Sequence, residues 1–148
     1  MCLSGDSGTG KSHLLIGLGA AAAEKGFRVA STSATRRLVN ELVEAADDKT
    51  LARTIARYGR VDVLVIDELD YVELDYVELD RRGAELLFQV LTEREEKNSV
   101  AVASNESFFG WTKTFTAPRL CAAIVDRFTF GGTIIETGTE SYRLAHTR

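Results

Sequence analysis

The chain has 148 residues, 45% of them hydrophobic and 27% charged, a composition typical of one globular domain spanning residues 1–148. Its net charge of −4 excludes tight nucleic-acid binding through bulk charge, because phosphate attraction needs a clustered positive surface; any DNA contact must be local. The two cysteines, Cys2 and Cys121, are far apart and lack a metal-like spacing, which argues against a zinc site or a disulfide framework.

We find no membrane-spanning or secretory signal in the sequence, which indicates a soluble protein. The longest apolar segment, LLIGLGAAAA, is too short and contains too much glycine to span a bilayer, and no cleavable leader is visible at the start. We therefore expect a cytoplasmic protein without a membrane partner.

Strand and helix patterns alternate along the chain. The sequence predicts strands at 1–4, 27–32, 61–67, 99–104 and 133–136, and helices at 10–25, from 35, at 50–55, at 81–97 and at 118–128. The run VDVLVID at 61–67 is apolar on both faces, which suits a parallel strand buried between two helical layers. The alternation predicts an α/β fold with a parallel five-stranded sheet.

The stretch between the first strand and the first helix fits G-x-x-x-x-G-K-[ST], the P-loop (Walker A) pattern. Its glycines allow backbone N–H groups to approach phosphate oxygens, and the helix start adds a positive dipole end. A chance glycine turn is the alternative, which the flanking strand and helix disfavour. The predicted nucleotide-binding residues are Gly5, Asp6, Ser7, Gly8, Thr9, Gly10, Lys11 and Ser12, with Lys11 on the β- and γ-phosphates and Ser12 on Mg²⁺.

Polar residues end two of the predicted strands. Asp67 and Glu68 follow the buried strand at 61–67, where Asp67 can reach Mg²⁺ and Glu68 can polarise an attacking water. Asn105 follows the strand at 99–104 and can orient that water. The alternatives are a strand that ends in solvated acids and an asparagine that only turns the chain. A P-loop kinase is disfavoured, because this set suits attack by water.

The ordered motifs GDSGTGKS, VLVIDE, AVASN, AAIVDRF and ESYRL resemble the IstB-like ATPases, AAA+ helper proteins encoded beside a transposase in insertion sequences. The resemblance extends over nearly the whole chain, and DnaC-like helicase loaders are the runner-up. It implies that the chain forms a homo-oligomer on double-stranded DNA and hydrolyses ATP with Mg²⁺. It also implies that this oligomer helps a cognate transposase. The alternative, from another functional class, is a remnant that binds nucleotide but does not hydrolyse it.

The resemblance also implies arginines that act on nucleotide. Arg127 in VDRF is the candidate arginine finger for a neighbouring subunit, with an ordinary surface ion pair as the alternative. Arg143 in SYR is a weaker candidate for a sensor. The remaining candidates for DNA contact are expected to be surface or core residues instead: Arg36, Arg37, Lys113, Phe108, Phe109 and Trp111.

The resemblance implies a helical region ahead of the ATPase core, associated with DNA and transposase binding. The given sequence starts almost inside the first strand, so we expect that region to be missing and the first strand to be truncated. That strand should be central in the sheet, and each lost inward side chain would cost about 1.5–3 kcal/mol. Because total stability is typically ~5–15 kcal/mol, folding survives with little margin. A misplaced start codon, an isolated domain and a decayed element all remain open.

The second departure is a tandem repeat, YVELDYVELD at 71–80. Five extra residues would reverse the faces of a strand or rotate a helix by about 140° off register, so we expect the insertion to loop out. The extra copy at 71–75 is predicted to bulge, and Asp80 to cap a helix that begins at Arg81. A second metal site built from the acids of the repeat is disfavoured.

Overall fold

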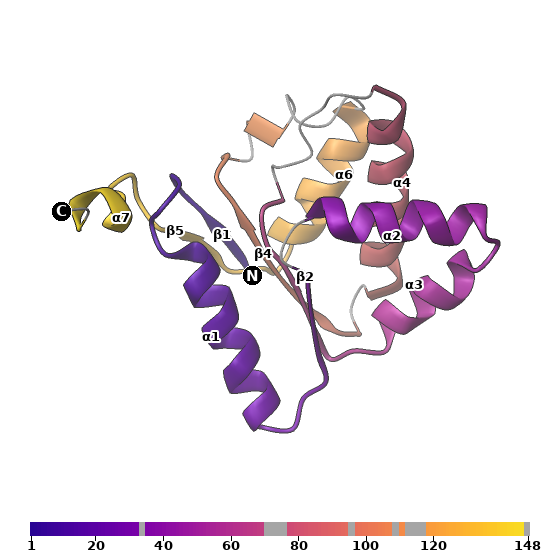
Figure 1. Cartoon of the computed structure of the whole chain (residues 1–148), viewed down its shortest axis with the longest axis horizontal. Coiled ribbons are helices and arrows are strands. Elements are labelled where there is room, and N and C mark those ends of the chain that lie inside the picture. Colours follow the sequence, from indigo (N-terminus) through magenta and orange to yellow (C-terminus); the bar gives the residue numbers. More distant parts are fainter. Residues whose placement is uncertain (33–34, 70–76, 95–96, 108–109, 112–117, 147–148) are drawn as a thin grey trace.

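The computed structural model describes the chain except residues 33–34, 70–76, 95–96, 108–109, 112–117 and 147–148, and it describes no side chain at 77–80 or 143 (Figure 1). The strands are β1 (Cys2–Ser4), β2 (Val29–Thr32), β3 (Val63–Ile66), β4 (Ser99–Ser104) and β5 (Ile134–Glu136). The helices are α1 (Lys11–Glu24), α2 (Thr35–Asp47), α3 (Leu51–Gly59), α4 (Val77–Arg94), α6 (Pro118–Thr129) and α7 (Tyr142–Ala145).

The strands form one parallel sheet in the order β2-β3-β4-β1-β5. This confirms the predicted five-stranded parallel sheet and places β1 between two neighbours, with Ser4 opposite both Ser104 of β4 and Glu136 of β5. In a parallel sheet all carboxyl ends point to one edge. The segments that follow β1, β3 and β4 are therefore brought together at that edge.

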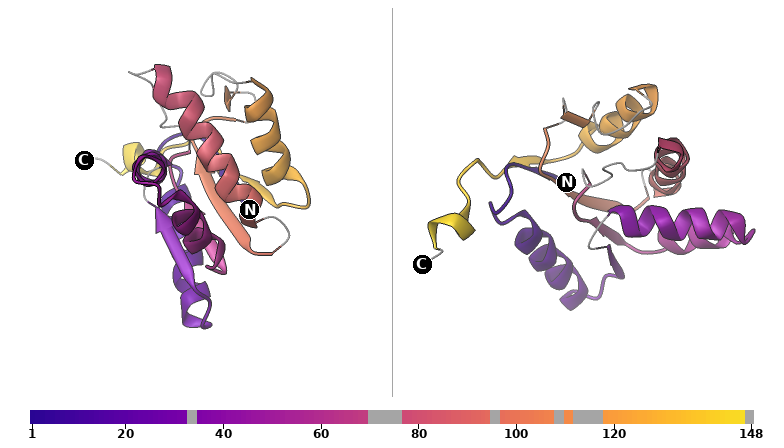
Figure 2. Two further views of the ribbon diagram at one scale, coloured as in Figure 1. Left: turned by 90° about the vertical axis from the view of Figure 1, so that its right-hand side faces the viewer. Right: turned by 45° about the horizontal axis from the view of Figure 1, so that its top comes forward.

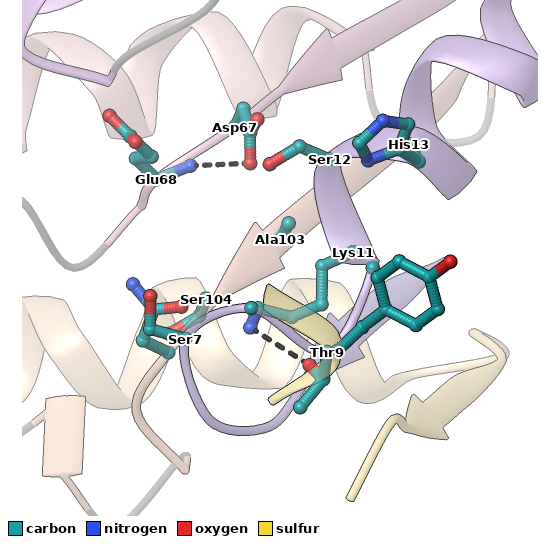
Figure 3. A pocket seen from close by; sticks show the side chains of 13 residues that line it. Ser7, Thr9, Lys11, Ser12, His13, Asp67, Glu68, Ala103 and Ser104 are labelled. Carbon is teal, nitrogen blue, oxygen red and sulfur yellow. Dashed lines mark hydrogen bonds between the residues drawn. The ribbon is translucent and has the colours of Figure 1, made fainter. Parts of the chain in front are cut away.

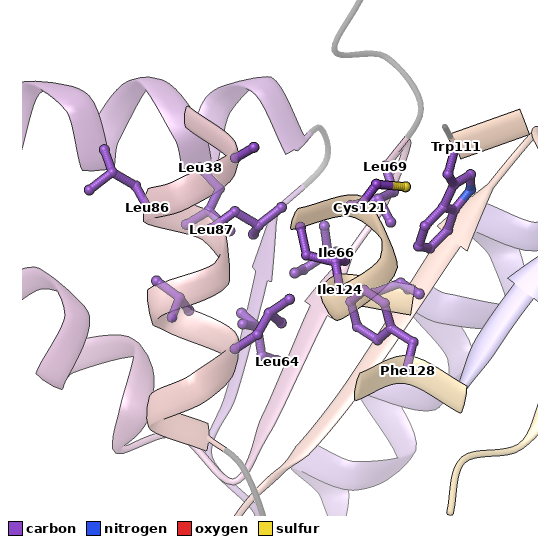
Figure 4. Packing of buried hydrophobic residues seen from close by; sticks show 14 of the residues in the cluster. Leu38, Leu64, Ile66, Leu69, Leu86, Leu87, Trp111, Cys121, Ile124 and Phe128 are labelled. Carbon is purple, nitrogen blue, oxygen red and sulfur yellow. The ribbon is translucent and has the colours of Figure 1, made fainter. Parts of the chain in front are cut away.

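Helices cover both faces of the sheet (Figures 1 and 2). Side chains alternate between the faces because successive residues of a strand point in opposite directions. On one face, Leu15 of α1 packs against Leu3, Val65 and Ala103. On the other face, residues of α2, α4 and α6 form the larger core with Cys2, Leu64, Ile66 and Val102 (Figure 4).

The start of α4 corrects one prediction. The helix begins at Val77, so Asp80 lies inside it and does not cap a helix that begins at Arg81. Glutamate and leucine of the second repeat copy are good helix formers, which lets the helix extend toward its N-terminus. The predicted bulge at 71–75 lies outside the described residues.

Other boundaries differ by a few residues. Helix α3 continues to Gly59, past the predicted end at 55, and α4 ends at Arg94 instead of 97. The short helix α7 was not predicted; Ser141 caps it by accepting a hydrogen bond from the Leu144 N–H. In the part of the chain that the structure describes, no helix combines the length and the apolar character needed to cross a bilayer.

Candidate nucleotide-binding site

A pocket lies at the edge of the sheet where the carboxyl ends of the strands meet (Figure 3). Four segments that are distant in sequence contribute to it: the P loop with the first turn of α1, the end of β3, the end of β4 and the start of α7. Its lining residues are Ser7, Gly8, Thr9, Gly10, Lys11, Ser12, His13, Asp67, Glu68, Ala103, Ser104, Asn105 and Tyr142. The predicted phosphate loop, acid pair and asparagine thus share one cavity.

The P loop owes its shape to glycine. Gly8 and Gly10 have φ values of 86° and 93°, in the left-handed region that side chains rarely adopt. Gly10 is the N-cap of α1, and its carbonyl accepts the first helical hydrogen bond, from Leu14 N–H at 3.0 Å. The loop therefore delivers the positive end of α1 into the pocket.

Lys11 is buried beside the loop, with 6% of its surface exposed. Its ammonium donates hydrogen bonds to the carbonyls of Gly5 and Asp6, both at 2.7 Å. Gly5 and Asp6 thus contact Lys11, although they are not among the lining residues. A buried ammonium at a helix N-terminus creates a strongly positive region that is suited to phosphate.

The acid pair at the end of β3 is fixed by its backbone. Asp67 N–H donates to the Thr32 carbonyl at 3.1 Å, and Leu69 N–H donates to the Ala103 carbonyl at 2.9 Å. Glu68, between these two anchors, has a φ of 51°, which is unfavourable for any residue except glycine. Such a conformation costs about 1–3 kcal/mol and persists only where the surroundings impose it. The anchors therefore hold the backbone of Glu68 at the rim of the pocket.

The pocket brings together two side chains of the types that ligate Mg²⁺. Figure 3 shows the Ser12 hydroxyl and the Asp67 carboxylate pointing toward each other. Among the described residues, no cluster of three or more histidine, cysteine or acidic side chains could hold a metal alone. One hydroxyl and one carboxylate fit Mg²⁺ that is also bound by nucleotide phosphates, the usual mode for this ion.

Asn105 lines the pocket directly after β4, next to a buried hydrogen-bond network. The Ser104 hydroxyl accepts hydrogen bonds from the Trp111 indole at 2.9 Å and from the Glu106 N–H at 3.1 Å. Trp111 is itself buried and packs edge-on against Phe128. This agrees with the expected core role of Trp111, and it fixes the backbone on which Asn105 sits.

Arg127 does not line this pocket. It lies on α6, with its guanidinium 4.9 Å from the centre of the Phe88 ring, and it lines a separate cavity with Met1, Leu91 and Phe130. Within one chain it therefore stays apart from the P loop. The other arginine candidates, Arg36 and Arg37, are exposed on α2.

Several earlier candidates lie outside the described residues: Phe108, Phe109, Lys113 and the side chain of Arg143. Sequence reasoning missed four residues that the fold brings to the pocket: the apolar Ala103, and the polar or aromatic His13, Ser104 and Tyr142. His13 and Ser104 adjoin motif residues, which was a usable signal. Tyr142 follows β5, and no spacing pattern connects it with the P loop.

The sequence matches the family described as "IstB-like ATP binding protein" over residues 1–148. It is 37% identical over 141 residues to an insertion sequence ATP-binding protein of Sinorhizobium fredii, covering 95% of this chain and 45% of that protein. It is 35% identical over 146 residues to the IS21 ATP-binding protein of Pseudomonas aeruginosa, covering 99% and 53%. The chain thus spans about half the length of these relatives.

Solved structures show the same fold at low sequence identity. DnaA of Aquifex aeolicus bound to AMPPCP superimposes with a TM-score of 0.73 at 23% identity, covering 92% of this chain and 39% of that chain. DnaI superimposes with a TM-score of 0.73 at 21% identity, covering 92% and 71%. The fold is that of the P-loop AAA+ proteins, and, since the family match extends over its whole length, the chain belongs to the IstB-like ATP-binding proteins.

Proposed function

We propose that this chain hydrolyses ATP with Mg²⁺ and acts as a helper of DNA transposition. The observation that carries the proposal is the single pocket that joins the P loop, the acid pair and Asn105. A loop that only bound phosphate would need neither an acid held in a left-handed conformation nor an amide across from it. This combination suits attack by water on a phosphoryl group.

Each residue has a role in the proposed reaction. Lys11 and the P-loop N–H groups bind the β- and γ-phosphates, and Asn105 orients the attacking water. Ser12 and Asp67 hold Mg²⁺, which neutralises charge on the phosphate oxygens when bound. Glu68 accepts the proton of the water as it attacks.

Transposition is proposed from the relatives, whose names place them in insertion sequences. Their additional half gives room for contacts with double-stranded DNA and a cognate transposase. With a net charge of −4, this chain would contact DNA only through local groups such as Arg36 and Arg37, repeated around a homo-oligomer. Arg127, which lies apart from its own pocket, is proposed to act as an arginine finger in a neighbouring subunit.

The test is ATP binding and steady-state turnover, with and without duplex DNA, over a range of protein concentrations. We expect Lys11→Ala to abolish binding. Glu68→Gln should bind ATP like the wild type but turn over about 10²–10⁴-fold more slowly, the usual contribution of a general base.

Two results would contradict the proposal. A wild-type chain that binds ATP without turnover at any concentration would indicate a nucleotide-binding remnant. Capture of a replicative helicase, with no effect of DNA on turnover, would indicate a helicase loader.

A further inference from the structure

The strand order gives the nucleotide pocket two distinct sides. Strand β1, which leads into the P loop, lies between β4 and β5. Asp67 and Glu68 arrive from β3 and Asn105 from β4, so the reacting end of a nucleotide lies on that side if the proposed function holds. Tyr142 arrives from the other side, after β5, where Figure 1 shows α7 at the opposite edge of the sheet from β2. The base of a nucleotide bound in this way would be directed toward Tyr142.

The segment that follows β5 is bound directly to the P loop. Thr137 binds the end of β1, and the residues that follow it lie along the P loop. The backbone of the segment contributes Thr137 N–H to Ser4 O at 2.8 Å, Asp6 N–H to Gly138 O at 3.1 Å and Tyr142 N–H to Gly8 O at 3.1 Å. The Thr137 hydroxyl adds hydrogen bonds to Ser4 O at 3.2 Å and to Thr9 Oγ1 at 2.6 Å. This segment is thus a fixed wall of the pocket.

Two P-loop glycines make the close approach of this wall possible. A Cβ on Gly5 would lie 2.4 Å from Thr137 Oγ1, and a Cβ on Gly8 would lie 2.2 Å from Ser141 Oγ. Real Cβ atoms do not come so near to oxygen. The glycine pattern of the loop therefore serves contact with the wall as well as contact with phosphate.

The Tyr142 ring is placed to receive a flat ligand. Its backbone is fixed by Gly8, the residue lines the pocket, and 67% of its surface is exposed. One face of the ring stacks on the His146 imidazole, with ring centres 3.9 Å apart and planes 23° apart. The His146 ring is oriented in turn by a 2.9 Å hydrogen bond between its Nδ1 and the Tyr142 carbonyl oxygen. An aromatic ring that is supported on one face and open on the other suits stacking with a nucleobase.

We propose that Tyr142 is the stacking surface for the base of the bound nucleotide and that His146 supports it from behind. Stacking recognises the π-face of a base and not its hydrogen-bonding edge, so Tyr142 adds affinity for nucleoside triphosphates such as ATP without itself discriminating among the bases. Tyr142 then supplies affinity for the base, whereas Lys11 and the P loop supply affinity for the phosphates.

The experiment measures dissociation constants by calorimetry for MgATP and for magnesium tripolyphosphate, which has no base. We expect Tyr142→Ala to weaken ATP binding about tenfold, within the range for one base stacked on one aromatic ring, and to leave tripolyphosphate binding unchanged. Tyr142→Phe keeps the ring and should bind ATP like the wild type. Leu144→Ala changes another exposed residue of the same short helix and serves as the matched control.

Each other outcome has a defined meaning. Unchanged ATP binding in Tyr142→Ala, or an equal loss for ATP and tripolyphosphate, would overturn the stacking role while the nucleotide site stands. Equal affinity of the wild-type chain for MgATP and for magnesium tripolyphosphate would also overturn the stacking role. Failure of the wild-type chain to bind ATP at all would overturn the proposed function itself. Because Tyr142 is exposed, circular dichroism of its alanine variant should match the wild type.

Discussion

Glu68 combines an unfavourable backbone conformation with a position at the pocket. Its φ of 51° costs about 1–3 kcal/mol, whereas glycine at this position would cost about 0.5–1 kcal/mol of additional chain entropy. The backbone strain that glycine would remove is larger than the chain entropy that it would cost. Glu68→Gly should therefore raise the free energy of unfolding by about 1 kcal/mol and, because it removes the general base, slow ATP turnover about 10²–10⁴-fold. Urea denaturation and an ATPase assay check the two halves of this prediction.

Lys49 provides the matched control, since it is the other non-glycine residue with positive φ, at 58°, among those that the structure describes. It follows α2 and does not line the pocket. Lys49→Gly should stabilise the chain similarly but leave turnover unchanged. A loss of stability in Glu68→Gly alone would show that favourable contacts of the Glu68 side chain outweigh the backbone strain.

Which pocket residues could be foreseen depended on how they are connected along the chain. The residues of the P loop are consecutive, and Asp67 and Asn105 directly follow buried strands, so pattern and strand topology were sufficient to predict that they meet. Tyr142 reaches the pocket only because β5 pairs with β1 and the following segment binds the P loop. No local sequence pattern encodes that contact.

Among the secondary-structure elements, β2 and β3 are joined at their starts by an ion pair. Asp62 accepts hydrogen bonds from the Arg28 guanidinium at 2.8 Å and 3.1 Å and from the Arg28 N–H at 2.7 Å. These bonds, the guanidinium bond first, lower the pKa of Asp62 to about 2. In the unfolded chain the group titrates near its usual pKa of about 3.9.

The lowered pKa predicts a pH dependence of stability. Because folding favours ionised Asp62, its contribution is complete above about pH 4 and is lost as the pH falls toward 2. Urea midpoints measured across this range should fall more steeply for the wild type than for Asp62→Asn. Arg28→Met should flatten the curve in the same way, and an unchanged slope in both variants would contradict the assignment.

Helix and strand identities followed from periodicity, but their ends did not. The run at 61–67 was predicted as buried and parallel, and β3 at Val63–Ile66 has that environment. The residue type of Asp80 favours a cap and so predicts a helix from Arg81, but the preceding residues are themselves compatible with a helix, and α4 includes them from Val77. Propensity decides such boundaries only where packing does not.

At the scale of the whole molecule, Arg127 lies outside the nucleotide pocket of its own chain. Alternating strands and helices were sufficient to predict the sheet between helical layers, because few topologies satisfy parallel pairing with short connections. No comparable rule predicts, from the sequence of one chain, how two subunits contact each other. The proposed finger role of Arg127 therefore needs an experiment that detects action between chains.

Mixing two inactive variants provides that experiment. A Lys11→Ala chain has a defective pocket but retains Arg127, and an Arg127→Ala chain retains the pocket but lacks the finger. If Arg127 acts on a neighbour, the mixture should hydrolyse ATP faster than the sum of the two variants measured separately, because mixed interfaces pair an intact pocket with an intact arginine. Arg119→Ala changes an exposed arginine of the same helix and should retain wild-type turnover alone. Full activity of Arg127→Ala alone would show that hydrolysis does not need Arg127. An inactive Arg127→Ala chain whose mixture is no faster than the sum would assign Arg127 a role within its own chain.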